Sequence, residues 1–289
     1  MTPEHPPESD AAPPALADAS AQLRNVRIVL VRTSHAGNIG AAARAMRTMG
    51  LSHLVLVAPK RPIDDAARAL ASGGADLLDR ATHEPTLDAA VAECVQVFGC
   101  TARSRTVSLP QFSPRQAAAA LLEHALTGPV ALVFGNERTG LTNQELTRCA
   151  AQVHIAADPD YPSLNLAAAV QIAAYELRGA ALDRAASSVD ALERAPRDDA
   201  RVDPALDDAA TAAQLEGLAT HLQNALFAVD FFKGRVPDTL MRRLRRLCQR
   251  ARMTASEVAL LRGILSDVER VAQLSGFEPR PLAERRQRR

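Results

Sequence analysis

Residues 129–143 read Pro-Val-Ala-Leu-Val-Phe-Gly-Asn-Glu-Arg-Thr-Gly-Leu-Thr-Asn, and this stretch decides the fold. Its apolar beginning, residues 129–133, is bounded by Gly128 and predicts a fully buried strand of a parallel sheet. The loop at 134–141 would then leave the carboxyl end of that strand. Open α/β sheets bind their ligands at such ends, so this loop is the first candidate for a binding site.

The glycines and polar residues of this loop support the same interpretation. Gly135 and Gly140 carry no Cβ atom, so the chain can turn sharply and a ligand can approach the main chain. Thr142 and Glu145 have the spacing of a capping box, which predicts a short helix directly after the loop. Taken alone, the loop also fits an ordinary surface turn between strand and helix.

Strand and helix patterns alternate on both sides of this stretch. Apolar runs that predict strands occur at 26–31, 54–58, 95–99 and 151–156. Helical patterns occur at 39–49, 64–72, 87–93, from Ser113-Pro114 onward, and at 164–182, with Asn38 and Ser163 as the expected N-caps of the first and last. Alternation of this kind predicts an α/β fold with a mainly parallel sheet covered on both faces.

The rest of the chain divides by composition. Residues 1–23 are rich in Pro, Ala and Ser and predict a disordered leader before an α/β domain at 24–182. A charged linker is expected at 183–212. Three amphipathic helical patterns then predict a small all-α domain at 213–276, followed by a basic tail at 277–289.

Composition excludes several classes of protein. No segment has the features of a signal peptide or a membrane span, and the four cysteines lack the spacing of a zinc site, which favours a cytoplasmic protein with free thiols. Aromatic residues are few and Trp is absent, so stacking on bases is not expected. Residues 230–289 carry 15 basic and 7 acidic side chains, which favours a polyanion as partner, although a solvated helix face is the alternative.

Three predicted loops lie at equivalent ends of parallel strands: Cys100-Thr101-Ala102, residues 134–141 and residues 155–164. Together they offer backbone groups, small side chains and apolar edges, which suit an adenine and a ribose better than a triphosphate. No phosphate-binding Gly-x-x-x-x-Gly-Lys-Ser/Thr loop is present in the sequence.

Three ordered motifs make the chain recognisable: Asn38-x-Gly40-x-x-x-Arg44, Phe134-Gly135-x-Glu137-x-x-Gly140-Leu141, and Ser163-Leu164-Asn165-Leu166-Ala167. They resemble the motifs of the SpoU branch of the SPOUT class of RNA methyltransferases. Residues 33–40, residues 102–105 and the appended helical domain are similar to those of the bacterial tRNA (cytidine/uridine-2′-O)-methyltransferases. The resemblance covers roughly residues 24–275.

The resemblance implies a C-terminal trefoil knot between about Gly135 and Ala174, a rare exception to ordinary chain topology. It also implies a homodimer and a site for S-adenosylmethionine (AdoMet) near the partner subunit, without a metal. The implied AdoMet contacts are Cys100, Thr101, Ala102, Gly135, Ile155, Pro162, Ser163 and Leu164. Pro162 departs from the serine that other members can have, and it offers no amide donor.

The implied activity is methylation of a ribose 2′-hydroxyl in tRNA, at the pyrimidine of position 32 in the anticodon loop. Arg44 is the implied catalytic side chain, and Asn38 would fix the loop and contact the ribose. A guanidinium is a poor base, so Arg44 would polarise the hydroxyl or hold a phosphate, and whether it accepts the proton stays open. Ribosomal RNA, another tRNA position, or RNA binding without turnover are the alternatives.

RNA contacts are expected from arginines in two places. Arg103 and Arg105 follow the first pocket loop, and Arg242, Arg243 and Arg246 crowd one helical pattern of the small domain. That domain would either bind tRNA or brace the dimer. Glu137 is expected to anchor its own loop through backbone amides.

Overall fold

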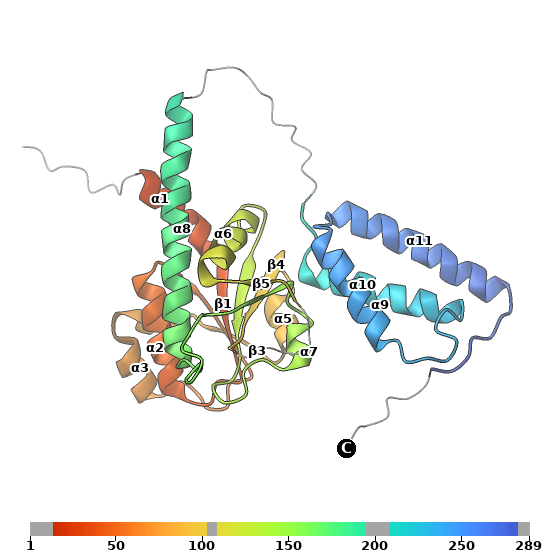
Figure 1. Cartoon of the computed structure of the whole chain (residues 1–289), viewed down its shortest axis with the longest axis horizontal. Helices are drawn as coiled ribbons and strands as arrows, with labels where there is room; N and C mark the ends of the chain where they lie inside the picture. The colour runs from red at the N-terminus through yellow and green to blue at the C-terminus, as the bar shows by residue number, and fades with distance from the viewer. Residues whose placement is uncertain (1–13, 103–108, 195–207, 283–289) are drawn as a thin grey trace, which may run out of the picture.

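The computed structural model describes residues 14–102, 109–194 and 208–282 (Figure 1). Its first part contains a seven-stranded sheet with the strand order β3-β2-β1-β6-β4-β7-β5. The strands are β1 Val26–Val31, β2 His53–Val57, β3 Thr82–Glu84, β4 Gln96–Cys100, β5 Gln111–Phe112, β6 Val130–Phe134 and β7 Ala151–Val153. All strand pairs are parallel, which confirms the predicted α/β class.

Strand β6 lies at the centre of this sheet, between β1 and β4, and all five of its residues are buried. Val130, Leu132 and Phe134 belong to one hydrophobic core, whereas Ala131 and Val133 belong to the other. Successive side chains of a strand point to opposite faces, so an uninterrupted apolar run serves two cores at once. The prediction of a fully buried strand is confirmed.

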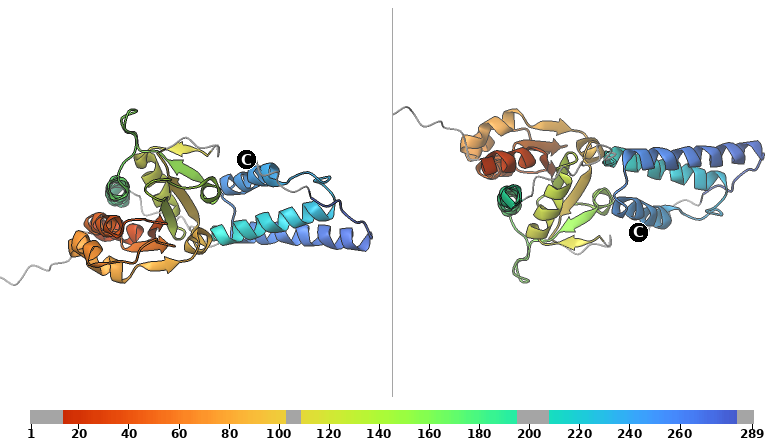
Figure 2. Two further views of the ribbon diagram at one scale, coloured as in Figure 1. Left: turned by 90° about the horizontal axis from the view of Figure 1, so that it is seen from below. Right: turned by 90° about the horizontal axis from the view of Figure 1, so that it is seen from above.

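Helices cover both faces of the sheet (Figures 1 and 2). One core joins the sheet to α1 Pro14–Arg24, α2 Ala36–Thr48, α6 Pro114–His124 and α8 Leu166–Arg194, with α3 Asp65–Ala71, the short 3-10 turn Ser72–Gly74 and α4 Ala75–Asp79 beside α2. The other core joins the opposite face to α5 Leu87–Val91 and α7 Asn143–Leu146.

Two of the expected segment boundaries are wrong. Residues 14–23 of the predicted leader belong to α1, in which Ala19 and Leu23 are fully buried in the core that also contains α8. Residues 183–194 of the predicted linker continue α8, and Ala185 is still buried there. In both places tertiary packing of small and apolar side chains stabilises helix in a segment whose composition is typical of a linker. Residues 1–13 and 195–207 lie outside the described part of the chain.

The helix starts are partly as predicted. Thr142 and Ser113 each form a complete capping box at α7 and α6. The predicted caps Asn38 and Ser163 are wrong. Helix α2 has His35 at its N-cap, without a side-chain cap bond, and at α8 the side-chain oxygen of Asn165 accepts the amide of Ala167 at 2.8 Å. Asn38 therefore sits inside the first turn of α2 and keeps its side chain for other contacts.

The second part of the chain is a helical domain of α9 Ala212–Ala228, α10 Asp238–Arg250 and α11 Ala255–Leu274. It lies beside the sheet domain, next to α5 (Figure 1). Two backbone bonds join the domains, from Ala212 to the carbonyl of Cys94 at 2.8 Å and from Ala213 to that of Ala92 at 3.0 Å. Residues 208–210 of the predicted linker pair with 253–255 and so belong to this domain.

Among the described residues, no helix combines the length and apolarity needed to cross a bilayer. The trefoil knot stays a prediction, because strand order and register do not describe how the chain threads.

Candidate active site

Three loops meet in one pocket at the carboxyl ends of the central strands. The pocket is lined by Cys100, Thr101, Ala102, Phe134, Gly135, Asn136, Glu137, Arg138, Thr139, Gly140, Ile155, Ser163, Leu164, Leu166 and Ala169. Seven of the eight predicted AdoMet contacts are therefore brought together. Pro162 is not among the lining residues and is exposed. The predicted meeting of the three loops is confirmed.

Gly135 is required by the loop itself. A Cβ atom at this position would lie 2.2 Å from the carbonyl carbon of Gly140 and 2.2 Å from the nitrogen of Leu141. The loop is closed at this point by the amide of Gly140, which donates to the carbonyl of Asn136 at 2.7 Å, and Gly140 has a φ of +64°. Any side chain at 135 would open the loop and not merely occupy the pocket.

Glu137 holds the loop that precedes α2. Its carboxylate accepts the backbone amide of Ser34 at 2.8 Å, that of His35 at 3.2 Å and the side-chain amide of Asn38 at 3.0 Å. Glu137 also accepts its own backbone amide and, at 3.4 Å, the side-chain amide of Asn136, so the expected anchoring of its own loop is confirmed in part. The expectation missed the partners in the β1–α2 connection and in the first turn of α2. The carboxylate therefore joins two of the sequence motifs.

These contacts keep Glu137 ionised. Burial by itself would raise its pKa, but the hydrogen bonds from Asn38, Ser34 and His35 outweigh burial and hold the pKa below its ordinary value. A carboxylate that already accepts this many bonds is a structural anchor and not a general base.

Asn38 also contacts the third motif. Its Oδ1 atom accepts the side-chain amide of Asn165, which lies at the start of α8, at 3.0 Å. A chain of side-chain hydrogen bonds thus runs from Glu137 through Asn38 to Asn165 along the edge of the pocket. The three motifs are far apart in the sequence, and these hydrogen bonds bring them into contact in the structure.

A second pair of contacts fixes the base of the pocket loop, and sequence reasoning missed it. Arg32 forms a two-point ion pair with Glu145, and the side-chain amide of Asn136 donates to the carbonyl of Arg32 at 2.7 Å. Glu145 also completes the capping box of α7, so one carboxylate serves both the helix and the loop. Arg32 has a φ of +52°, which its sequence context did not signal.

The pocket offers backbone groups, small side chains and apolar edges. Burial raises the pKa of Cys100 to about 12, which disfavours the nucleophilic thiolate. The pocket is open to solvent, and its volume of about 100 Å³ is smaller than that of a typical nucleoside-sized site.

Arg44, the predicted catalytic side chain, does not line this pocket. It is exposed on α2, and no hydrogen bond or ion pair engages it within the described parts of the chain. Its Cα lies near Gly74, on the side of α2 that packs against the following short helices. Arg103 and Arg105 lie outside the described residues.

The arginines of α10 fall into two groups. Arg243 is exposed, whereas Arg242 and Arg246 are half-buried and line a narrow gap against Leu109 and Thr147 of the sheet domain. Arg242 also donates to the hydroxyl of Thr239 at 3.2 Å. Of the three predicted RNA contacts on this helix, Arg243 has the most open position.

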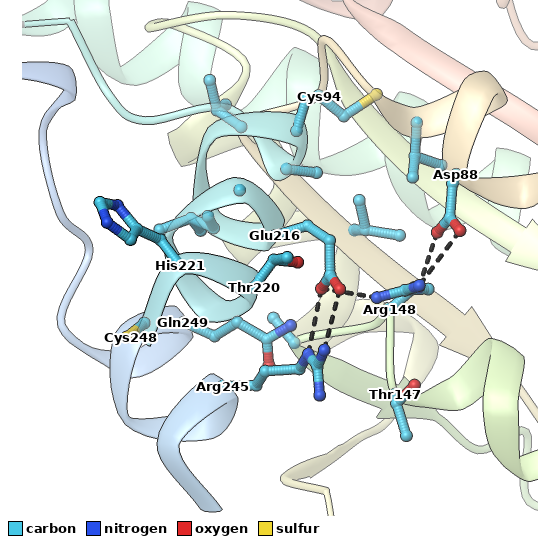
Figure 3. A pocket seen from close by; sticks show the side chains of 18 of the residues that line it. Asp88, Cys94, Thr147, Arg148, Glu216, Thr220, His221, Arg245, Cys248 and Gln249 are labelled. Carbon is cyan, nitrogen blue, oxygen red and sulfur yellow. Dashed lines mark hydrogen bonds and ion pairs between the residues drawn. The ribbon is translucent and has the colours of Figure 1, made fainter. Parts of the chain in front are cut away.

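A cavity of about 650 Å³ lies elsewhere, between the two domains near the amino end of β4 (Figure 3). Arg148 pairs there with Asp88 at 2.6 Å and with Glu216 at 2.5 Å, and Glu216 also accepts two bonds from Arg245 at 2.9 and 3.0 Å. The charges neutralise one another. This cluster therefore helps to hold the domains together.

Within the described residues no group of His, Cys, Asp and Glu side chains has the arrangement of a metal site. All four cysteines are free. The pocket at the carboxyl ends of β4 and β6 defines the class: an α/β domain with a candidate ligand site at its sheet and an appended helical domain.

Comparisons with known proteins agree with this class. Residues 25–175 match the SpoU rRNA Methylase family, and residues 213–276 match the C-terminal domain of the tRNA methyltransferase TrmJ. The chain is 46% identical over 247 residues to the tRNA (cytidine/uridine-2′-O-)-methyltransferase TrmJ of Cronobacter sakazakii, covering 86% of this chain and 97% of that protein. For the enzyme of the same name from Yersinia enterocolitica, the identity is 47% over 250 residues, with 86% and 93% coverage.

Solved structures show the same similarity. TrmJ from Z. mobilis superposes with a TM-score of 0.68 at 33% identity, covering 84% of this chain and 98% of that one. A probable methylase family protein from Haemophilus influenzae gives a TM-score of 0.53 at 38% identity, with 88% and 99% coverage. The chain belongs to the TrmJ branch of the SpoU methylase family.

Proposed function

We propose that the protein transfers a methyl group from AdoMet to the ribose 2′-hydroxyl of the cytidine or uridine at position 32 of tRNA. The observation that carries this proposal is the series of hydrogen bonds Glu137–Asn38–Asn165, which joins the first motif to the two motifs that line the pocket. Relatives at 46–47% identity over most of both chains carry the name of this activity.

The residues of the pocket fit AdoMet. Apolar edges from Ile155 and Leu164 suit the adenine, and the backbone of the Cys100–Ala102 segment offers hydrogen-bonding groups for the nucleoside. When bound, AdoMet supplies an electrophilic methyl group on a positively charged sulfur. The protein supplies orientation, since holding the attacking oxygen in line with the methyl group accounts for much of the rate of such a displacement.

Arg44 is proposed to act on the substrate ribose, as the side chain that polarises the hydroxyl or holds the adjacent phosphate. Arg44 does not line the pocket of its own chain, and we infer that it reaches the ribose at the pocket of a partner subunit. A homodimer satisfies this geometry. Tyr161, before the third motif, and Tyr175, on α8, are 79% and 62% exposed, and exposed aromatic side chains of this kind suit such an interface.

The helical domain is proposed to bind tRNA outside the reaction site. Its exposed arginines, Arg243 and Arg250, have no ion-pair partner among the described residues. Arg103 and Arg105 would add contacts beside the pocket. A cytoplasmic protein with tRNA as substrate and no metal is consistent with these features.

Two measurements test the proposal. Calorimetry on Ala102→Trp, in which an exposed lining residue gains a bulky ring, should show loss of AdoMet binding with the fold intact. This substitution is preferred to a change at Gly135, where any Cβ strikes the backbone of Gly140. Ribose methylation is then mapped in total RNA from cells with and without the protein. Cells without the protein should lose the signal at position 32 of tRNA alone. A signal lost from ribosomal RNA, the RNA in the name of the SpoU rRNA Methylase family, would replace the proposed substrate.

A further inference from the structure

Beside the cofactor pocket lies an open hollow of about 700 Å³ whose lining includes Lys60, Arg61, His35, Glu137 and Arg138. Glu137 and Arg138 line both spaces, so the two share a wall. Anything bound in the hollow therefore lies next to a group reacting in the pocket. No motif of the family falls on Lys60 or Arg61.

The hollow carries unpaired positive charge. Lys60, Arg61 and Arg138 are exposed, and none has a side-chain partner in the described parts of the chain. The one carboxylate in the wall, Glu137, already accepts bonds from Ser34 and Asn38. It cannot turn to neutralise the three cations without breaking the contacts that hold the motif loops.

The hollow is also built on fixed backbone. The amide of Lys60 donates to the carbonyl of Thr33 at 3.0 Å, which ties the loop after β2 to the loop after β1. On the other wall the amide of Arg138 donates to the side chain of Asn136 at 3.1 Å. The Cα positions of the cations are therefore held in place, while the long side chains remain free to adapt.

We propose that this hollow binds the RNA backbone phosphates that flank the reacting ribose. The inference rests on the proposed function, because it places those phosphates by reference to the methylated nucleotide. Cations spread around an open concave surface suit a chain of phosphates, whereas a small anion would be better held in an enclosed site with converging donors. Lys60 and Arg61 thereby become positioning residues for the substrate.

The test uses the full-length variant Lys60→Ala/Arg61→Ala, with Arg80→Ala as matched control. Arg80 is exposed to a similar degree, pairs only with Asp76 at a distant surface, and lines neither space. Binding of tRNA is measured at several salt concentrations in the absence of turnover. Two lost contacts should lower the slope of log affinity against log salt by about 1.4, at about 0.7 per phosphate of a single strand.

In methylation assays the double variant should show a KM for tRNA raised about tenfold or more, with kcat and AdoMet affinity close to wild type, because neither residue touches the cofactor pocket. Arg80→Ala should match wild type throughout. A salt slope and KM equal to wild type would overturn the proposal and leave the hollow to another polyanion, such as an acidic protein surface. A loss of AdoMet affinity in the double variant would also overturn it, by showing that the loop merely supports the pocket.

The two proposals fail in different ways. If the wild-type protein binds tRNA but methylates none, the proposed function is wrong, and the binding slopes still decide whether Lys60 and Arg61 contact RNA. If the wild type methylates tRNA and the slopes do not differ, only the assignment of the hollow is wrong.

Discussion

The Nδ2 atom of Asn165 lies 3.0 Å from the Oδ1 atom of Asn38, although 127 positions separate the two residues. Asn38 donates in turn to Glu137. Each asparagine can satisfy this chain in one orientation only, because the other orientation of Asn38 would turn its oxygen toward the Glu137 carboxylate. Side-chain hydrogen bonds therefore link the first turn of α2, the loop after β6 and the residue before α8.

The substitution Asn165→Asp should remove the hydrogen bond to Asn38 while it keeps the cap of α8. An aspartate still accepts the amide of Ala167, so α8 and the melting temperature should change little. It cannot donate to Asn38, and two acceptor oxygens would face each other. We expect the rate of methyl transfer to fall by about tenfold or more, since a loosened loop costs orientation.

The control for this substitution is Asn165→Ala, which removes the cap together with the link and should lower both activity and melting temperature. Activity of Asn165→Asp at the wild-type level would show that the link between the first and third motifs has no part in catalysis.

Arg44→Ala should lower turnover by about 100-fold or more, the range expected for one positioned catalytic group. AdoMet affinity and stability should be unchanged, because the side chain is exposed and lies outside the pocket. Arg47→Ala is the matched control, one turn further along α2, where the side chain pairs only weakly with Asp76 at 3.9 Å.

Mixing Arg44→Ala with Ala102→Trp tests whether the arginine acts across a dimer. If Arg44 serves the partner's pocket, random exchange of subunits should restore about a quarter of wild-type activity, since half of the dimers would be mixed and each would hold one complete site. If Arg44 serves its own chain, no mixed dimer has a complete site and the mixture stays inactive.

Much of the sheet domain follows from sequence, because its strands are continuous apolar runs whose ends are marked by turn residues. Strand β1 was predicted with its observed bounds, Val26–Val31. The edge strands β3 and β5, three and two residues long, were missed since they are too short to show a period. Helix α1 was missed because the Pro-, Ala- and Ser-rich composition of residues 1–23 was assigned to a disordered leader, whereas Ala19 and Leu23 are buried in the core.

The candidate site was predictable to a similar extent. Backbone-lined loops such as Cys100–Ala102 are placed by the strands they follow, so their meeting could be expected. Side-chain links between loops could not, as the partners Arg32–Glu145 and Asn38–Asn165 are more than 100 positions apart. The hollow around Lys60 was missed for the same reason, since its cations come from separate connections.

Glu216→Gln should loosen the two domains. Burial alone would raise the pKa of Glu216, but the bonds and charges of Arg245 and Arg148 outweigh burial and lower it. A lowered pKa in the docked state means that the ionised form favours docking. This contribution is present above the ordinary glutamate pKa of about 4.3 and is lost as the pH falls below it.

Hydrogen exchange of α9 and α5 at neutral pH should therefore be faster in Glu216→Gln, and in the wild type it should speed up below about pH 4. Asp267→Asn provides a control on α11, where the carboxylate pairs with Arg270 of the same helix at 2.9 Å. Equal protection in the variant and the wild type would mean that the backbone bonds from Ala212 and Ala213 suffice to hold the domains.

Arg243→Ala/Arg250→Ala should weaken tRNA binding without changing AdoMet affinity, because both side chains are exposed on α10. The salt slope should fall by about 1.4, at about 0.7 per lost contact. Arg245→Ala is the contrasting variant, since Arg245 is engaged by Glu216 and should affect domain docking more than the slope. An unchanged salt slope for the double variant would mean that the exposed arginines of α10 form a solvated surface or brace the dimer and do not contact tRNA.

The most direct test of the whole account is reconstitution with purified protein, unmodified tRNA and AdoMet, in buffer containing a metal chelator, followed by mass spectrometry of nuclease fragments. The account predicts one methyl group per tRNA, on the ribose 2′-oxygen of the pyrimidine at position 32, at a rate that the chelator does not change. Methylation of a base, of a different nucleotide, or of ribosomal RNA in place of tRNA would contradict it.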